Sequence, residues 1–315
     1  MDALRIVFMG TPELARASLQ ALLEVNDFQV VAAVTQPDRP KGRDLRLQAS
    51  PVKELALRSN LPVLQPERAR HPAFVEELRL LAPDLIAVAA YGQILPQSIL
   101  DLPRYGCLNV HTSLLPKYRG AAPIQWAVLN GDADTGVTIM KMDAGMDTGE
   151  ILTQEKTRIE EMDDAGTLHD RLAHIGATLL VRTIHEHVAG LIQPRPQPLA
   201  GVSMAPKIKK TDGRLDWTQP APVLRNRVRG LAPWPGAFTF LPEQPQPHLL
   251  KIWHVEIEDA SGSAGEVLQA DKTGLIVACG RQALRITSLQ REGGKRLAAA
   301  DFLAGHPLQP GLHFV

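Results

Sequence analysis

Cysteine and aromatic residues are scarce in this 315-residue chain. Its two cysteines, Cys107 and Cys279, are too few for a disulfide framework and cannot make a metal site alone. Aromatic residues make up 4%, which argues against a broad surface for stacking nucleic-acid bases. The longest apolar run, Leu85–Ala90, is far shorter than a membrane span, and Met1–Gly10 lacks the cationic start of a signal peptide. We therefore expect a cytoplasmic protein with no membrane partner.

The charge is balanced overall but unevenly distributed. Hydrophobic residues make up 44% and charged residues 22%, which is typical of a globular protein, and the length favours about two domains. Residues 1–206 hold 20 Lys and Arg against 24 Asp and Glu, whereas residues 207–315 hold 14 against 10. A basic C-terminal part suggests a large anionic partner such as a nucleic acid. The alternative is a chance excess, which the charge alone favours.

The first half of the chain alternates between strand and helix patterns. This alternation predicts an α/β fold, with a Rossmann-like parallel sheet covered on both faces. The predicted helices begin at prolines and span Pro12–Leu23, Pro51–Ser59 and Pro72–Leu81. Ala165–Ala189 has the apolar spacing of one long helix. The predicted strands are Leu4–Phe8, Gln29–Thr35, Leu85–Ala89, Leu108–His111, Val137–Lys141 and Glu150–Glu155.

The pattern changes near residue 190. Gln193–Pro198 holds three prolines in six residues, and we interpret residues 190–210 as an extended linker. Short β-type runs then follow, separated by Gly, Ser and Asp, which is typical of a small β-barrel. The prediction is an N-terminal domain over residues 1–189, the linker, and a smaller barrel domain over residues 211–315. The predicted strands of the barrel are Leu250–Glu258, Gly265–Ala270, Leu275–Ala278 and Ala283–Leu289.

Three polar residues are candidates for catalysis. Asn109 and His111 are two apart near the end of a predicted strand, so their side chains project on the same side. The carboxyl edge of a parallel sheet is where ligands usually bind, and an amide beside an imidazole suits acyl transfer. Asp147 follows on a glycine-rich loop from which its carboxylate could reach the histidine and set its charge. A hydrogen-bonded cap of the strand is the alternative for the Asn–His pair.

Basic residues cluster in a long polar connection and again after the linker. Gln36–Ser50 contains Arg39, Lys41, Arg43 and Arg46, a spacing that suits phosphate contact. A solvated loop is an equally good interpretation of its composition. Lys207 and Lys209 repeat the pattern, as do Arg225, Arg227 and Arg229, although each group alone is more often a solvated face.

Together these residues resemble the folate-dependent formyltransferase family, most closely its members that act on methionyl-tRNA. The resemblance covers nearly the whole chain. One departure is Thr112, where the family usually has Gly or Ala. The motifs that carry the resemblance include Gly10-Thr11-Pro12, Thr35–Arg39, Ala90–Gly92, Asn109-Val110-His111, Ser113–Pro116, Arg119–Gln125, Gly136–Met140, Met142–Gly149, Lys207, Asp216-Trp217 and Pro233-Trp234-Pro235.

The resemblance implies a reaction. The expected activity is transfer of the formyl group of 10-formyltetrahydrofolate to the α-amino group of methionine on initiator methionyl-tRNA, for translation initiation. It further implies a folate-binding catalytic domain, a tRNA-binding domain like an OB-fold, no metal, and a monomer. A formyltransferase for a small amine, such as an amino sugar or ribonucleotide, is the nearest alternative. A nucleic-acid-binding module is disfavoured by the intact motifs, and a dehydrogenase by the incomplete glycine fingerprint.

The resemblance also assigns roles to residues. Asn109, His111 and Asp147 are the expected catalytic set, in which Asn109 and a charged His111 donate hydrogen bonds to the oxyanion. The expected folate contacts are Ser113, Leu114, Leu115, Pro116, Tyr91 and Gly92. The expected tRNA contacts are Arg43, Arg39, Lys41, Lys207 and Lys209, with Arg43 approaching the acceptor end.

Overall fold

The structure is a computed structural model that describes residues 3–41, 46–242 and 246–315. These residues divide into two compact units, each assembled from three stretches of chain. The first unit comprises Met1–Pro123, Asp134–Arg158 and His169–Ala205, and the second comprises Ile124–Ala133, Ile159–Leu168 and Pro206–Val315. No helix in the described ranges is both long and apolar enough to cross a membrane.

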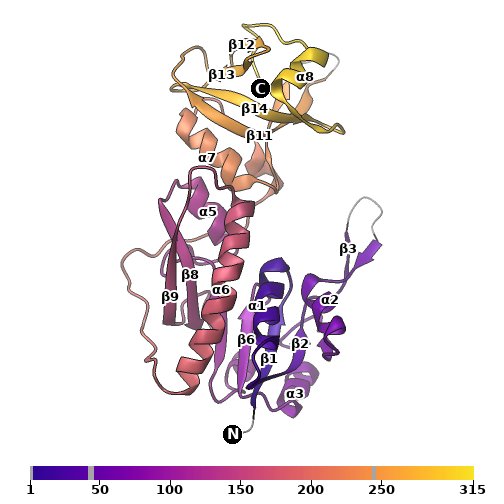
Figure 1. The fold of residues 1–315 in the computed structure, drawn as a ribbon, viewed down its shortest axis with the longest axis vertical. Coiled ribbons are helices and arrows are strands. Elements are labelled where there is room, and N and C mark those ends of the chain that lie inside the picture. Colours follow the sequence, from indigo (N-terminus) through magenta and orange to yellow (C-terminus); the bar gives the residue numbers. More distant parts are fainter. Residues whose placement is uncertain (1–2, 42–45, 243–245) are drawn as a thin grey trace. The chain divides into compact units, whose positions relative to one another are not determined.

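The first unit is built on a seven-stranded sheet (Figure 1). The predicted α/β architecture is confirmed, but the sheet is mixed, because β7, β8 and β9 pair antiparallel whereas the other neighbours are parallel. Only residues 142–149 join β8 to β9, too few for the crossover that a parallel pair needs. In sheet order the strands are β5 (Val63–Leu64), β2 (Phe28–Val34), β1 (Leu4–Gly10), β6 (Leu85–Ala89), β7 (Cys107–His111), β8 (Asp134–Lys141) and β9 (Glu150–Arg158).

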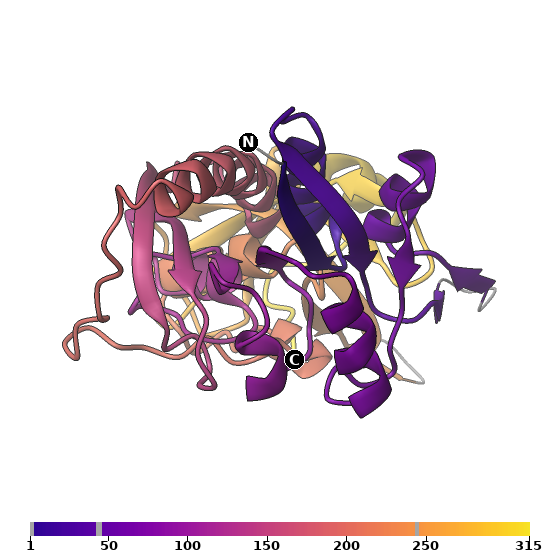
Figure 2. The same ribbon diagram turned by 90° about the horizontal axis from the view of Figure 1, so that it is seen from below.

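Helices cover both faces of this sheet, and α3 and α6 lie on opposite sides (Figure 2). A Cβ on Gly176 of α6 would lie 2.8 Å from Cγ1 of Val110, so the missing side chain lets α6 approach β7. Because side chains alternate along a strand, Asn109 and His111 face away from α6. The helices of this unit are α1 (Glu13–Leu23), α2 (Pro51–Arg58), α3 (Pro72–Leu80), α4 (Gln97–Leu100) and most of α6 (Ala165–Val188).

The basic connection between β2 and α2 contains a short hairpin that the sequence did not predict. Its strands are β3 (Arg39–Lys41) and β4 (Arg46–Gln48), in which Arg39 pairs with Gln48. At its base Lys53 Nζ lies 2.6 Å from Asp38 Oδ2, and this hydrogen bond lowers the pKa of Asp38. Arg43 lies outside the described residues.

The proline-rich stretch after α6 is extended, but it packs onto the first unit. Arg195 exchanges two backbone hydrogen bonds with Ile151, at 2.8 and 2.9 Å. Further along, Met204 forms a bridge with Arg119. This stretch is therefore a structural part of the first unit and not a free linker.

The second unit contains an antiparallel sheet in the order β10-β11-β14-β13-β12, with β15 paired to β14. The predicted small β domain is thereby confirmed as a six-stranded antiparallel sheet. Trp217, Leu224 of α7 and Phe302 of α8 pack in its core. The elements are β10 (Ala237–Leu241), β11 (His248–Glu258), β12 (Val267–Asp271), β13 (Gly274–Ala278), β14 (Ala283–Arg291), β15 (Arg296–Ala298), α5 (Pro123–Leu129), α7 (Ala221–Leu231), α8 (Ala299–Gly305) and the 3-10 turn η1 (Lys210–Gly213).

The arginines of α7 do not form the solvated face that their composition had suggested. Arg229 donates to the backbone oxygens of Asp163 and Glu160, at 2.6 and 2.7 Å. Arg225 pairs with the Glu161 carboxylate at 3.1 Å. Two of the three cations on this helix thus serve the packing of the second unit.

Candidate active site

A cavity of about 460 Å³ opens at the carboxyl ends of β6 and β7. Asn109 and His111 line it from β7, and Asp147 lines it from the loop between β8 and β9. The three candidates that the sequence separates by up to 38 positions thus border one cavity. A larger hollow of about 800 Å³ is lined by residues between Val63 and Glu77, and its lining contains none of these three.

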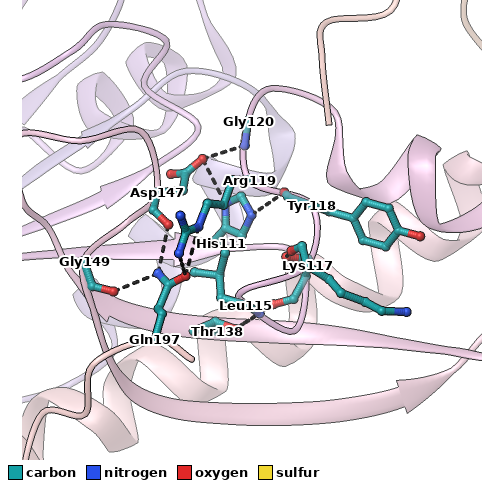
Figure 3. A network of polar contacts seen from close by, with 11 residues as sticks. His111, Leu115, Lys117, Tyr118, Arg119, Gly120, Thr138, Asp147, Gly149 and Gln197 are labelled. Carbon is teal, nitrogen blue, oxygen red and sulfur yellow. Dashed lines mark hydrogen bonds and ion pairs between the residues drawn. The ribbon is translucent and has the colours of Figure 1, made fainter. Parts of the chain in front are cut away.

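One ring nitrogen of His111 is hydrogen-bonded, and the other faces a carboxylate (Figure 3). Its Nε2 lies 2.9 Å from the backbone oxygen of Tyr118, and its Nδ1 lies 3.8 Å from Oδ2 of Asp147. Because a carbonyl oxygen can only accept, Nε2 carries the proton and donates it. In the neutral ring, Nδ1 is therefore the nitrogen with a free lone pair, and it faces the carboxylate.

A backbone group also fixes Asp147, at the same carboxylate oxygen that faces His111. The amide of Gly120 donates to its Oδ2 at 2.8 Å. Asp147 has a positive φ of 52°, a conformation that Asp tolerates better than most residues. Two residues on, a Cβ at Gly149 would lie 1.9 Å from the backbone oxygen of Lys141, so only glycine lets the hairpin close there. The loop shape thus depends on local backbone chemistry.

The charge state of His111 differs from the expectation. The imidazole is 5% exposed, and this burial lowers its pKa below the usual 6.5 more strongly than the Asp147 carboxylate and the Tyr118 carbonyl raise it. We therefore describe the resting His111 as neutral, a base with a carboxylate beside it. The sequence could not predict this because burial is set by the tertiary fold.

The expected folate contacts fall into two groups. Tyr91 and Gly92 line the cavity, and the buried Tyr91 hydroxyl has no hydrogen-bond partner among the described residues. Ser113, Leu114, Leu115 and Pro116 are not among the residues that line it. Ser113 is buried and donates to the Lys117 backbone oxygen at 2.6 Å. The folate role of this second group stays a prediction.

The expected tRNA contacts lie in both units. Arg39 is exposed on β3 of the first unit, and Lys207 and Lys209 are exposed in the second unit. Lys41 belongs to β3, and Arg43 lies outside the described ranges. Their role in binding stays a prediction.

Two features of the site were missed at the sequence level. One is the pair of backbone groups in the loop after β7, the oxygen of Tyr118 and the amide of Gly120, which hold His111 and Asp147. The sequence motif Arg119-Gly120 identifies this loop, but nothing in the neighbouring sequence indicates that the loop contacts His111 and Asp147. The other is Gln197, whose side chain bonds both loops of the site.

Potential metal ligands are not clustered in the part of the chain that the structure describes. No group of three or more His, Cys, Asp or Glu side chains there could hold a metal ion. Cys107 and Cys279 are buried, and burial raises the pKa of each thiol to about 12, so both are poor ligands.

Comparisons with known proteins identify the family of the chain. Residues 4–184 match the formyl transferase family, and residues 207–307 match the formyl transferase C-terminal domain. The chain is 50% identical to the methionyl-tRNA formyltransferase of Citrifermentans bemidjiense over 311 residues, which covers 99% of this chain and 96% of that protein. The enzyme of the same name from Myxococcus xanthus is also 50% identical, with 99% and 98% covered.

Solved structures share the fold at low identity. WlaRD, a sugar 3N-formyltransferase, superposes with a TM-score of 0.64 at 18% identity, covering 91% of this chain and 98% of that one. HypX from Aquifex aeolicus, in complex with tetrahydrofolic acid, gives 0.61 at 18% identity, covering 100% and 51%. At this identity these likenesses describe architecture and not substrate.

Proposed function

The chain belongs to the formyl transferase family, and we propose that it transfers the formyl group of 10-formyltetrahydrofolate to the α-amino group of methionine on initiator methionyl-tRNA. The observation that carries this proposal is the 50% identity over nearly the full length of relatives with this activity in their name. The cavity bordered by Asn109, His111 and Asp147 supplies the chemistry. Location in the cytoplasm and a monomeric state stay predictions from the sequence.

The cavity fits a folate in size and chemistry. Its volume of about 460 Å³ is within the usual range for small-molecule sites. Its lining is mostly apolar, with Val88, Ile94 and Met142 among the contributors. We propose that Tyr91 and Gly92, together with Ser113–Pro116, bind the folate, which supplies an activated formyl group.

The side chains can manage the charge and the proton of this transfer. As the amine attacks, negative charge grows on the formyl oxygen, and the amide of Asn109 donates a hydrogen bond to it. His111 accepts the amine proton at Nδ1, and Asp147 stabilises the imidazolium that forms. His111 then returns the proton to the departing folate nitrogen, so that charge and protons balance. The Nε2 proton stays on His111 throughout and remains hydrogen-bonded to the Tyr118 oxygen.

The test compares two acceptors in parallel assays. The purified chain is given 10-formyltetrahydrofolate with initiator methionyl-tRNA, or with an amino-sugar nucleotide as the small-amine alternative. We expect formylation of the tRNA and none of the sugar. Transfer to the sugar alone would replace the proposed substrate, and no transfer to either would overturn the assignment.

The exposed lysines of the second unit should determine tRNA affinity. We propose that Lys207 and Lys209, with Arg39, Lys41 and Arg43, contact tRNA phosphates. The double replacement of Lys207 and Lys209 by Ala should raise KM for methionyl-tRNA and reduce the slope of log KM against log salt by about 2 or less, because at most two phosphate contacts are lost. KM for the folate should not change. Lys272→Ala, another exposed lysine of this unit, is the control, and an equal effect there would contradict the assignment.

The lowered pKa of His111 has a consequence for stability. Above pH 6.5 His111 is neutral in both the folded and the unfolded chain, and its contribution to the free energy of unfolding is constant. As pH falls below 6.5, the unfolded histidine gains a proton before the buried one, so stability decreases until the folded pKa is reached. An NMR titration of the His111 ring, identified by its absence in His111→Asn, should give a pKa below 6.5. A value above 6.5 would contradict the neutral resting state.

A further inference from the structure

Residues 195–205 touch both loops that hold the catalytic side chains. We call this stretch the brace. Its backbone pairs with the loop after β7: Arg119 N donates to Ser203 O at 2.9 Å, and Ala205 N donates to Arg119 O at 2.7 Å. The hydroxyl of Ser203 also accepts from Tyr118 N at 2.9 Å. These bonds fix the residues on either side of the Tyr118 carbonyl, which accepts the hydrogen bond from His111 Nε2.

Close approach of the brace depends on Gly120. A Cβ at this position would lie 2.8 Å from the backbone oxygen of Ala205, and Gly120 has a φ of 120° that other residues rarely adopt. The amide of this same glycine binds Asp147. The residue that admits the brace is therefore also the one that anchors the carboxylate.

Gln197 extends the brace to the second loop (Figure 3). Its Nε2 donates to the backbone oxygens of Asp147 and Gly149, each at 2.8 Å. Its Oε1 accepts from Nε and Nη2 of Arg119, at 3.1 and 2.7 Å. Both donors of the amide are used, and a flipped amide would set NH₂ against a guanidinium that has no acceptor. One side chain thus links the loop of Asp147 to the loop of Tyr118 and Gly120.

We infer that Gln197 is a positioning residue, which holds Asp147 at its place opposite His111 by bonding the two loops together. This inference rests on the proposed function for its kinetic part only. Gln197 bonds the backbone of Asp147 and not its carboxylate, and it lies outside the lining of the cavity. Its effect passes through the backbone of Asp147, whose side chain faces His111 at 3.8 Å.

The first variant to measure is Gln197→Ala. Misplacement of a catalytic group by about 1 Å can cost about a hundredfold in rate, so we expect kcat to fall roughly 10- to 100-fold. KM for the folate should stay within about twofold, because Gln197 does not bond Tyr91 or Gly92, the cavity residues proposed to bind the folate. The His111 ring should titrate at a lower pH than in the wild type, since Asp147 is the group that raises its pKa by charge. A merely structural loss of stability would not move this titration.

Two further variants make the test specific. Gln197→Glu keeps an acceptor for Arg119 but loses both donors to Asp147 and Gly149, so it should be as impaired as Gln197→Ala. Leu199→Ser alters a residue of the brace that is 94% exposed, and it should behave as wild type. Wild-type kcat and titration in Gln197→Ala would overturn the inference, as would wild-type behaviour of Gln197→Glu or an equal loss in Leu199→Ser. If the wild type fails to formylate methionyl-tRNA, the proposed function fails, but the titration still tests the role of Gln197.

Discussion

Replacing Asp147 with Asn should lower kcat roughly 10²- to 10⁴-fold, the range typical of lost acid–base function. An asparagine has the same size and can still accept from the amide of Gly120, so the loop should keep its shape. It has no charge, however, and cannot stabilise the imidazolium that forms when His111 takes the amine proton at Nδ1. KM for the folate should change little, because the carboxylate acts on the histidine and not on the ligand.

Steady-state kinetics with methionyl-tRNA measure this effect. Glu150→Gln is a matched control, because it removes one carboxylate from an exposed position at the end of the same loop. It should retain wild-type kcat. A normal kcat in Asp147→Asn would remove Asp147 from the mechanism. An equal loss of kcat in both variants would show that Asp147 contributes only a negative charge near the site, with no specific action on His111.

Replacing Asn109 with Ala should lower kcat roughly 10²- to 10³-fold, the usual cost of losing one oxyanion donor. This corresponds to about 3–4 kcal/mol of transition-state stabilisation. Asn109 is partly exposed on β7 and lines the cavity on the same face as His111. Its amide is an uncharged donor, so its loss should not shift the titration of His111.

The measurement combines kcat with a direct titration of folate binding and a thermal unfolding curve. We expect the folate dissociation constant and the unfolding midpoint to stay near wild type while turnover falls. If binding weakens as much as turnover falls, Asn109 is a ground-state contact and not an oxyanion donor. Asn109→Asp is a second variant for the same measurement, because an ionised aspartate has the same size as asparagine but cannot donate a hydrogen bond.

Much of this site was predictable because its signals are local. Leu85–Ala89 was predicted as a strand and is β6 with the same bounds. Helix α1 begins directly after Pro12, as proline at a helix start predicts. The shared side of Asn109 and His111 follows from strand alternation. Their convergence with Asp147 does not, because β8 runs antiparallel to β7 and its loop starts beside Leu108, at the other end of β7 from His111.

The remainder depends on contacts that are distant in the chain. Gln197 bonds residues 50 and 78 positions away, from a stretch with no periodic pattern. The direction of β8 and β9 is also not encoded in their apolar alternation, although the eight-residue connection between them was a usable clue. The hairpin in the basic connection contains Arg, Pro and Lys, which local strand preference does not favour.

The place of the brace in the chain also determines when the site is complete. A ribosome releases the chain from its N-terminus, so all the strands of the seven-stranded sheet emerge before Arg195. Asn109, His111 and Asp147 are then already present, but the side chain that joins their loops is not yet made. During synthesis, the sheet and its cavity can form first, whereas the catalytic geometry is fixed only when Gln197 and the residues that follow it have left the exit tunnel.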